Sequence, residues 1–263
     1  MPGAHVDDVE IEVVAGAAVL RTCERAGGGA MRRAGIAAGC VFALIATAAH
    51  AQLKPEVQTG SLIPVKPRTL EREDAGVVRK HFAQCVYRSA KPKVVALLDH
   101  SDAVAVDLPG AHIKNVSAEL NMESCLGDEV GINENALGMK FSVNTLRDLL
   151  AEEAYLANDR TPPSLPSAVP PLDAKFVSTG DGLARAQALT AFADCAVTGD
   201  LADADALLRT TPGSDQERAA AVALAPGLGK CLVQGQKVSL TPMSIRALLS
   251  YGLWTRFVRE KNQ

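Results

Sequence analysis

Apolar positions recur at helical spacing in two distant parts of the chain. The first part carries Val78, Phe82, Cys85 and Val86, and the second carries Leu189, Phe192, Ala193, Ala196 and Val197. Steps of three and four residues place side chains on one face of an α-helix. The pattern therefore predicts two amphipathic helices, each with a cysteine on or beside its buried face.

Further helices are indicated by their start signals and by shorter apolar periods. Thr241-Pro242 is an N-cap residue followed by proline at the first helical position, and Ser142 is a second candidate N-cap. Residues 200–208 and 215–224 are expected to form shorter helices. The predicted fold class is mainly α.

Residues 103–113 also permit another interpretation. Val104, Val106 and Leu108 occupy alternate positions just before Pro109-Gly110. A period of two is typical of a half-buried strand. This stretch is therefore the place where the sequence allows a short strand.

The two helical parts repeat each other in sequence. The matched blocks are Phe82-Ala83-Gln84-Cys85 with Phe192-Ala193-Asp194-Cys195, Ala96-Leu97-Leu98 with Ala206-Leu207-Leu208, Cys125-Leu126 with Cys231-Leu232, Arg147 with Arg246, and Tyr155 with Trp254. The blocks occur in one order, and the insertions fall between them, where loops tolerate length changes. We therefore expect two tandem copies of a small unit of about four helices each, over residues 71–160 and 174–263.

Proline-rich segments mark the boundaries of these units. Residues 161–171 contain five prolines, which cannot continue a helix or a central strand. We expect a linker over residues 161–173. Residues 52–70 have three more prolines and no apolar period, which indicates an extended lead-in.

A secretory signal peptide is predicted inside the chain, over residues 31–51. Met31-Arg32-Arg33 is cationic, residues 34–48 lack charge, and Ala49-His50-Ala51 has small residues where a signal peptidase cleaves, which places cleavage after Ala51. Residues 1–30 carry acidic side chains ahead of this segment, which indicates that Met31 is the true start. A membrane anchor and lipidation of Cys40 are the alternatives.

Export changes the meaning of the cysteines. Four remain after residue 51: Cys85, Cys125, Cys195 and Cys231. An even number in an oxidising compartment favours disulfides. Since each copy should carry its own bridge, we expect Cys85 to pair with Cys125 and Cys195 with Cys231, each contributing roughly 4 kcal/mol. Four buried free thiols are the alternative.

Charge and motifs offer little support for cofactor or nucleic-acid chemistry. The chain has 27 basic and 30 acidic residues, a net charge of −3, so no phosphate backbone is expected as a partner. Residues 227–231 resemble the end of a phosphate loop but lack its first glycine and its Ser/Thr, and we interpret them as a turn into a helix. No cofactor is predicted.

Two histidines are candidates for chemistry. His81 and Cys85 have the spacing of a helical metal-ligand pair, but Ala191 occupies the matched position in the second copy. His100 lies between an acid and a hydroxyl in Asp99-His100-Ser101-Asp102, a string that more often forms a turn or cap. We predict no metal and no catalytic residue.

The recurring Arg147 and Arg246 have two interpretations. They either bind a ligand or lay their stems on the core and pair with a carboxylate of the same unit. Tyr155 and Trp254 are expected to close each unit or the seam between the copies. The structural interpretation is preferred for both pairs.

These observations predict an exported bacterial protein of the periplasm or cell surface. Its expected role is a non-catalytic interaction or structural module with a protein partner in the envelope and no membrane insertion after signal cleavage. The alternative is a hydrolase or other envelope enzyme with its site in the groove between the copies. A pocket lined by His81, His100 or Arg147 with carboxylates favours the enzyme, and an apolar seam formed by Tyr155 and Trp254 favours the module.

Overall fold

The computed structural model describes residues 10–14, 17–21, 72–129, 142–158, 161–233 and 237–259. The predicted signal peptide over 31–51 and the lead-in over 52–70 lie outside the described residues. The prediction that residues 1–30 precede the true start is not tested by the structure and stays a prediction.

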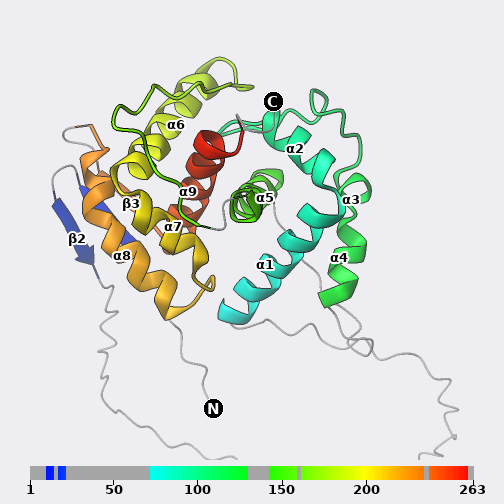
Figure 1. Cartoon of the computed structure of the whole chain (residues 1–263), viewed down its shortest axis with the longest axis horizontal. Coiled ribbons are helices and arrows are strands. Elements are labelled where there is room, and N and C mark those ends of the chain that lie inside the picture. The colour runs from blue at the N-terminus through cyan, green and yellow to red at the C-terminus, as the bar shows by residue number, and fades with distance from the viewer. Residues whose placement is uncertain are drawn as a thin grey trace, which may run out of the picture. The chain divides into compact units, whose positions relative to one another are not determined.

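The described chain is mainly helical, as predicted (Figure 1). The first half contains α1 (Arg72–Ser89), α2 (Lys91–Asp99), α3 (Val116–Glu119), α4 (Met122–Glu129) and α5 (Val143–Asn158). The second half contains α6 (Asp181–Gly199), α7 (Leu201–Arg209), α8 (Asp215–Lys230) and α9 (Pro242–Phe257). Strands β1 (Glu10–Val14), β2 (Ala17–Arg21) and β3 (Lys237–Leu240) form an antiparallel sheet in the order β2-β1-β3.

In each half, the predicted cap residue lies at the start of the last helix. Thr241 Oγ1 accepts the backbone N–H of Ser244, and Ser244 Oγ accepts the N–H of Thr241, which closes a capping box before α9. Ser142 Oγ accepts the N–H of Thr145 at the start of α5. These bonds satisfy backbone donors that a helix leaves without intrahelical partners.

One disulfide ties helices together within each half. Cys85 of α1 bonds Cys125 of α4, and Cys195 of α6 bonds Cys231 at the C-terminal end of α8. These are the pairs that the matched cysteines predict. Both bridges are local, so neither crosses from one half to the other.

Helices α5 and α9 pack against each other at the centre of the fold. Figure 1 shows α5 nearly end-on, with α1 and α2 on one side and α9 on the other. Tyr155 of α5 and Trp254 of α9 are buried, and buried apolar residues of both halves belong to one continuous cluster. The two halves therefore share a core.

The strand allowed by the sequence over 103–113 is not formed. The structure has only an isolated bridge between Ser101 and Val106, followed by turns. The reason is Asp102, whose Oδ1 accepts the N–H groups of Val104 and Ala105 and bends the backbone. The alternating apolar pattern over residues 103–113 therefore wrongly indicated a strand.

The interpretation of residues 227–231 as a turn into a helix is also wrong. Helix α8 continues to Lys230, through Pro226, so these glycines form its last turn. Leu228 is buried there, and Cys231 is held by its disulfide. Packing and the covalent bond compensate for the backbone bond that proline removes.

The proline-rich segment forms no regular structure, as predicted from its prolines. Residues 161–179 contain neither helix nor strand, and most of residues 161–171 are exposed. Its path is fixed near its end, where Arg256 donates to the carbonyl of Pro170 and Asp102 Oδ2 accepts the N–H groups of Val177 and Ser178.

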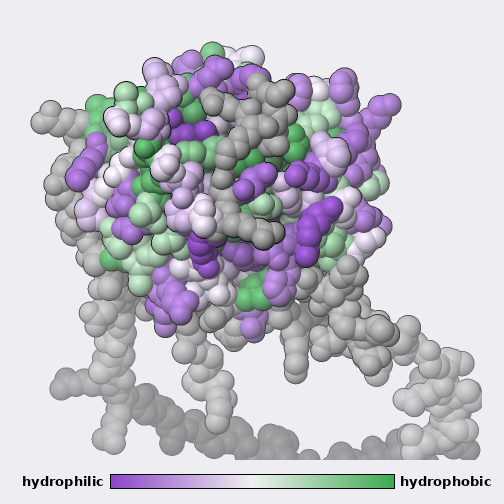
Figure 2. Space-filling view, viewed as in Figure 1, coloured by the Kyte–Doolittle hydropathy of each residue, from purple (hydrophilic) through white to green (hydrophobic). Residues whose placement is uncertain are grey.

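The surface is mixed in character. Figure 2 shows hydrophilic and hydrophobic side chains interspersed over the visible face. Among the described residues, the large apolar side chains that stand exposed are Val169, Val233 and Met243. Scattered apolar side chains of this kind are ordinary for a folded protein. Within the part of the chain that is described, no helix has both the length and the apolar character needed to cross a bilayer.

Candidate functional site

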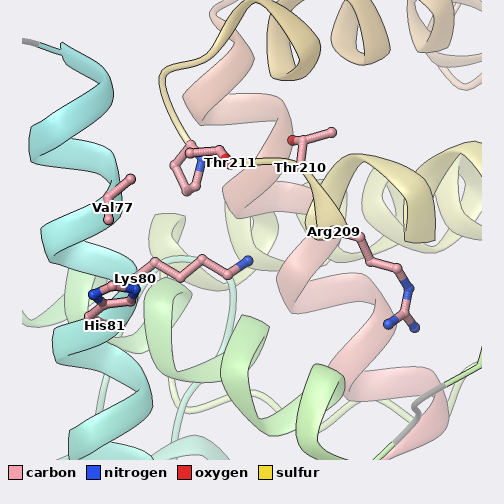
Figure 3. Close-up of a pocket in the computed structure, with 7 residues that line it drawn as sticks. Val77, Lys80, His81, Arg209, Thr210 and Thr211 are labelled. Carbon is pink, nitrogen blue, oxygen red and sulfur yellow. The ribbon is translucent and has the colours of Figure 1, made fainter.

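A small pocket lies between the two halves, where α1 faces the loop that joins α7 to α8 (Figure 3). Its volume is about 220 Å³, below the several hundred Å³ of ordinary small-molecule sites. It is lined by Val77, Lys80, His81, Arg209, Thr210, Thr211 and Pro212. Both halves therefore contribute to this candidate site.

Helical spacing and one glycine position the pocket. Val77, Lys80 and His81 stand three and four residues apart on α1, so they share one face. A Cβ atom added to Gly76 would lie 2.1 Å from the carbonyl oxygen of Pro212. Only glycine allows the helix and the loop to approach this closely.

The cationic side chains of the pocket are bonded to carboxylates of the protein. Lys80 Nζ lies 3.0 Å from Glu152 Oε1 and 3.0 Å from the carbonyl of Leu208. In Figure 3 the guanidinium of Arg209 turns away from Lys80. Arg209 donates to both carboxylate oxygens of Asp205, at 2.7 and 2.8 Å. These pairs reduce the positive field that an incoming anion would meet.

The pocket adjoins, through the half-buried Lys80, a group of four charged side chains, which we call the central charge cluster: Lys80, Glu152, Glu217 and Arg246. Arg246 Nε and Nη2 bind the two oxygens of Glu152 at 2.7 and 2.8 Å, and Nη1 lies 3.0 Å from Glu217 Oε1. Arg246 also donates to the carbonyls of Leu207 and Leu208. Arg246 and Glu217 are each 5% exposed.

The cluster favours the charged forms of Glu152 and Arg246. Burial alone would raise the pKa of Glu152, but the hydrogen bonds and charges of Arg246 and Lys80 outweigh burial and lower that pKa. Burial alone would lower the pKa of Arg246, but Glu152 and Glu217 raise it. Both directions stabilise the ion pair at neutral pH.

The two matched arginines occupy different environments. Arg147 donates to the carbonyl of Asp102 and to Asp148, and its guanidinium lies 5.4 Å from the ring centroid of Tyr251 in α9. Arg246 pairs with Glu217 of its own half and with Glu152 of the other half. Each arginine therefore pairs with a carboxylate of its own half, as expected, and Arg246 pairs in addition with Glu152 of the other half.

The candidate residues named by the sequence do not converge on one site. His81 lies on the pocket, while Cys85, four residues later, is in a disulfide and offers no thiolate to a metal. His100 is exposed at the C-terminal end of α2, and the buried Asp102 organises a turn. Within the described ranges, no three His, Cys, Asp or Glu side chains are placed to hold a metal ion.

The aromatic pair lies inside the molecule. Tyr155 Oη donates to Asp205 Oδ1 at 2.8 Å, across the boundary between the halves. The guanidinium of Arg259 lies 5.3 Å from the centroid of the Trp254 ring. Both aromatic residues are at most 1% exposed, so neither presents its ring on the surface.

Sequence reasoning missed Lys80, Glu152 and Glu217. The available signal was the pair Glu152-Glu153, which interrupts an otherwise apolar helix between Leu149-Leu150-Ala151 and Ala154-Tyr155. Acidic side chains are rarely buried in a protein core unless they are paired with a cation or a hydrogen-bond donor. That pattern predicts buried cationic partners, although it does not say which ones.

Comparison with protein-family models, with curated proteins and with solved structures finds no match to this chain.

Proposed function

We propose that this protein is an exported, non-catalytic helical module of the bacterial periplasm or cell surface, with an interaction or structural role. The observation that carries the proposal is the central charge cluster. Arg246 directs its guanidinium at Glu152, Glu217 and backbone carbonyls, so the polar groups between the halves serve to join them. The two disulfides are compatible with an oxidising compartment outside the cytoplasm.

We further propose that the two halves are copies of one unit. Helices α1, α2, α4 and α5 are followed in the same order by α6, α7, α8 and α9, while α3 has no counterpart. Each half has a disulfide from its first long helix to the helix before its last. Arg147 and Arg246 are both buried on the last helix of their half, which supports a duplication.

The export proposal is tested by intact mass. Full-length protein expressed in a bacterial host and recovered from the cell envelope should begin at Gln52, because cleavage follows Ala51. Peptide mapping of that protein without reduction should recover the two local disulfides. A chain that keeps residues 31–51, or that carries lipid on Cys40, would contradict the proposal.

The alternative, an envelope enzyme, is favoured by one observation: the pocket that holds Lys80 and His81 lies between the two halves. Affinity capture of the mature protein from an envelope extract, with His81→Ala and His100→Ala as matched variants, separates the two functions. A module should enrich the same defined partner in all three forms. An enzyme should turn over an envelope substrate and lose that activity in His81→Ala alone.

A further inference from the structure

Glu153 is a buried carboxyl group beside the central charge cluster. It follows Glu152 on α5, and its exposed fraction is 5%. The groups that act on it are Glu152 on its own helix, Lys80 and the neutral Gln84 on α1, and Arg246 on α9. Helix α5, on which Glu153 is buried, packs against α1 of the first half and α9 of the second half.

The charges of the cluster balance without Glu153. Lys80 and Arg246 supply two positive charges, and Glu152 and Glu217 supply two negative charges, all within direct ion pairs. Arg79 on α1 is a further half-buried cation, and its charge acts on Glu217. An ionised Glu153 would add a third buried carboxylate, and the two cations that act on it, Lys80 and Arg246, are already engaged in ion pairs.

Burying an uncompensated charge is costly, so the folded protein favours the neutral acid at this position. Burial is the largest influence and the charge of Glu152 the next, and together they raise the pKa of Glu153 to about 7. Lys80, Arg246 and the hydrogen bond from Gln84 oppose the increase without cancelling it.

We propose that Glu153 is a proton-controlled latch between the two halves: protonated, it lets α5 pack against α1 and α9, and its ionisation weakens that packing. The sign of the effect follows from proton linkage. The unfolded chain releases this proton near its ordinary pKa of 4.5, whereas the folded chain keeps it to about 7. Between these values the folded state binds more protons, so stability falls as pH rises and levels off above about 7. The latch does not depend on the proposed function.

Urea unfolding of the oxidised protein at pH 5 and pH 8 tests the proposal, with Trp254 fluorescence as the probe. Relative to E153Q, the unfolding equilibrium constant of the wild type should rise about 70-fold between these pH values. Glutamine keeps the shape of the neutral acid and does not titrate. His81, His100 and His112 are the same in both proteins, so their titration cancels. An equal pH response in the two proteins would overturn the proposal.

A matched variant tests whether the cluster, rather than burial alone, controls Glu153. In E152Q, Lys80 and Arg246 lose the carboxylate that they share, although Arg246 keeps Glu217, and both cations can pair with an ionised Glu153. The pH-dependent loss of stability should therefore shift to lower pH than in the wild type. An unshifted pH response would show that Glu152 and its partners do not set the latch.

A direct titration keeps the proposal falsifiable if E153Q does not fold. In wild-type protein labelled with ¹³C at glutamate carboxyl carbons, one NMR signal should titrate with a midpoint of about 7, well above the ordinary value of 4.5. If every glutamate signal titrates near its ordinary pKa, the latch does not exist.

Discussion

Replacing Arg246 by methionine should remove the principal polar joint between the halves. Methionine keeps much of the length and apolar stem of arginine but lacks its charge and donors. In the wild type, the guanidinium binds both oxygens of Glu152 and one oxygen of Glu217, and all three residues are at most 5% exposed. The substitution leaves two buried carboxylates short of a cation.

The expected loss of stability is roughly 3–5 kcal/mol, the usual cost of removing one partner from a buried ion pair. Arg218→Met is the matched control, because Arg218 pairs with Asp215, whose carboxylate is 91% exposed. A pair of that kind contributes roughly 0–1 kcal/mol. Since an unpaired Glu152 can be neutralised by a proton, the loss in Arg246→Met should shrink as the pH is lowered.

Urea unfolding at pH 7, followed by circular dichroism with the disulfides intact, measures the loss. A double-mutant cycle with Glu152→Gln isolates the pair, and the double variant should be more stable than the sum of the single losses predicts by roughly 0.5–3 kcal/mol. If Arg246→Met costs no more than Arg218→Met, or if the two losses add, the cluster does not hold the halves together.

Two further predictions concern the packing within and between the halves. Replacing Cys195 and Cys231 together by serine should lower the free energy of unfolding by up to about 4 kcal/mol, since the bridge closes a loop with a sequence separation of 36. An unchanged urea midpoint would contradict this prediction. Gly76→Ala should lower the free energy of unfolding by roughly 1–3 kcal/mol, because the added Cβ would meet the Pro212 carbonyl. The control Gly182→Ala should leave the thermal midpoint nearly unchanged, because the nearest atom to its added Cβ is 3.6 Å away. Equal thermal midpoints for the two variants would refute the close approach at Gly76.

The helices and the disulfides were predictable because their causes are local or compositional. Phe82 and Ala193 lie on buried helix faces that the apolar period identifies, and Thr241 begins α9 through bonds to residues three positions away. The cysteine pairing was predicted from the matched positions of the cysteines in the two sequence blocks and from their even number. None of these inferences needs the three-dimensional arrangement of the helices.

The central charge cluster could not be predicted, because its members are far apart in sequence. Arg246 and Glu152 are separated by 94 residues and meet only because α5 packs on α9. Local patterns also failed where a specific contact overrides them. Asp102 turns a stretch with strand-like alternation, and buried Leu228 lies in a helix that continues past Pro226.

The local disulfides leave residues 161–180 as the covalent route between the halves in the described chain. A single proteolytic cut in the exposed 161–171 stretch would produce two fragments, each still closed by its own bridge. Those fragments would remain associated under native conditions through the α5–α9 contact and the Arg246–Glu152 pair. The two halves therefore act as binding partners joined in one chain, and the connecting segment sets the effective concentration of each half for the other.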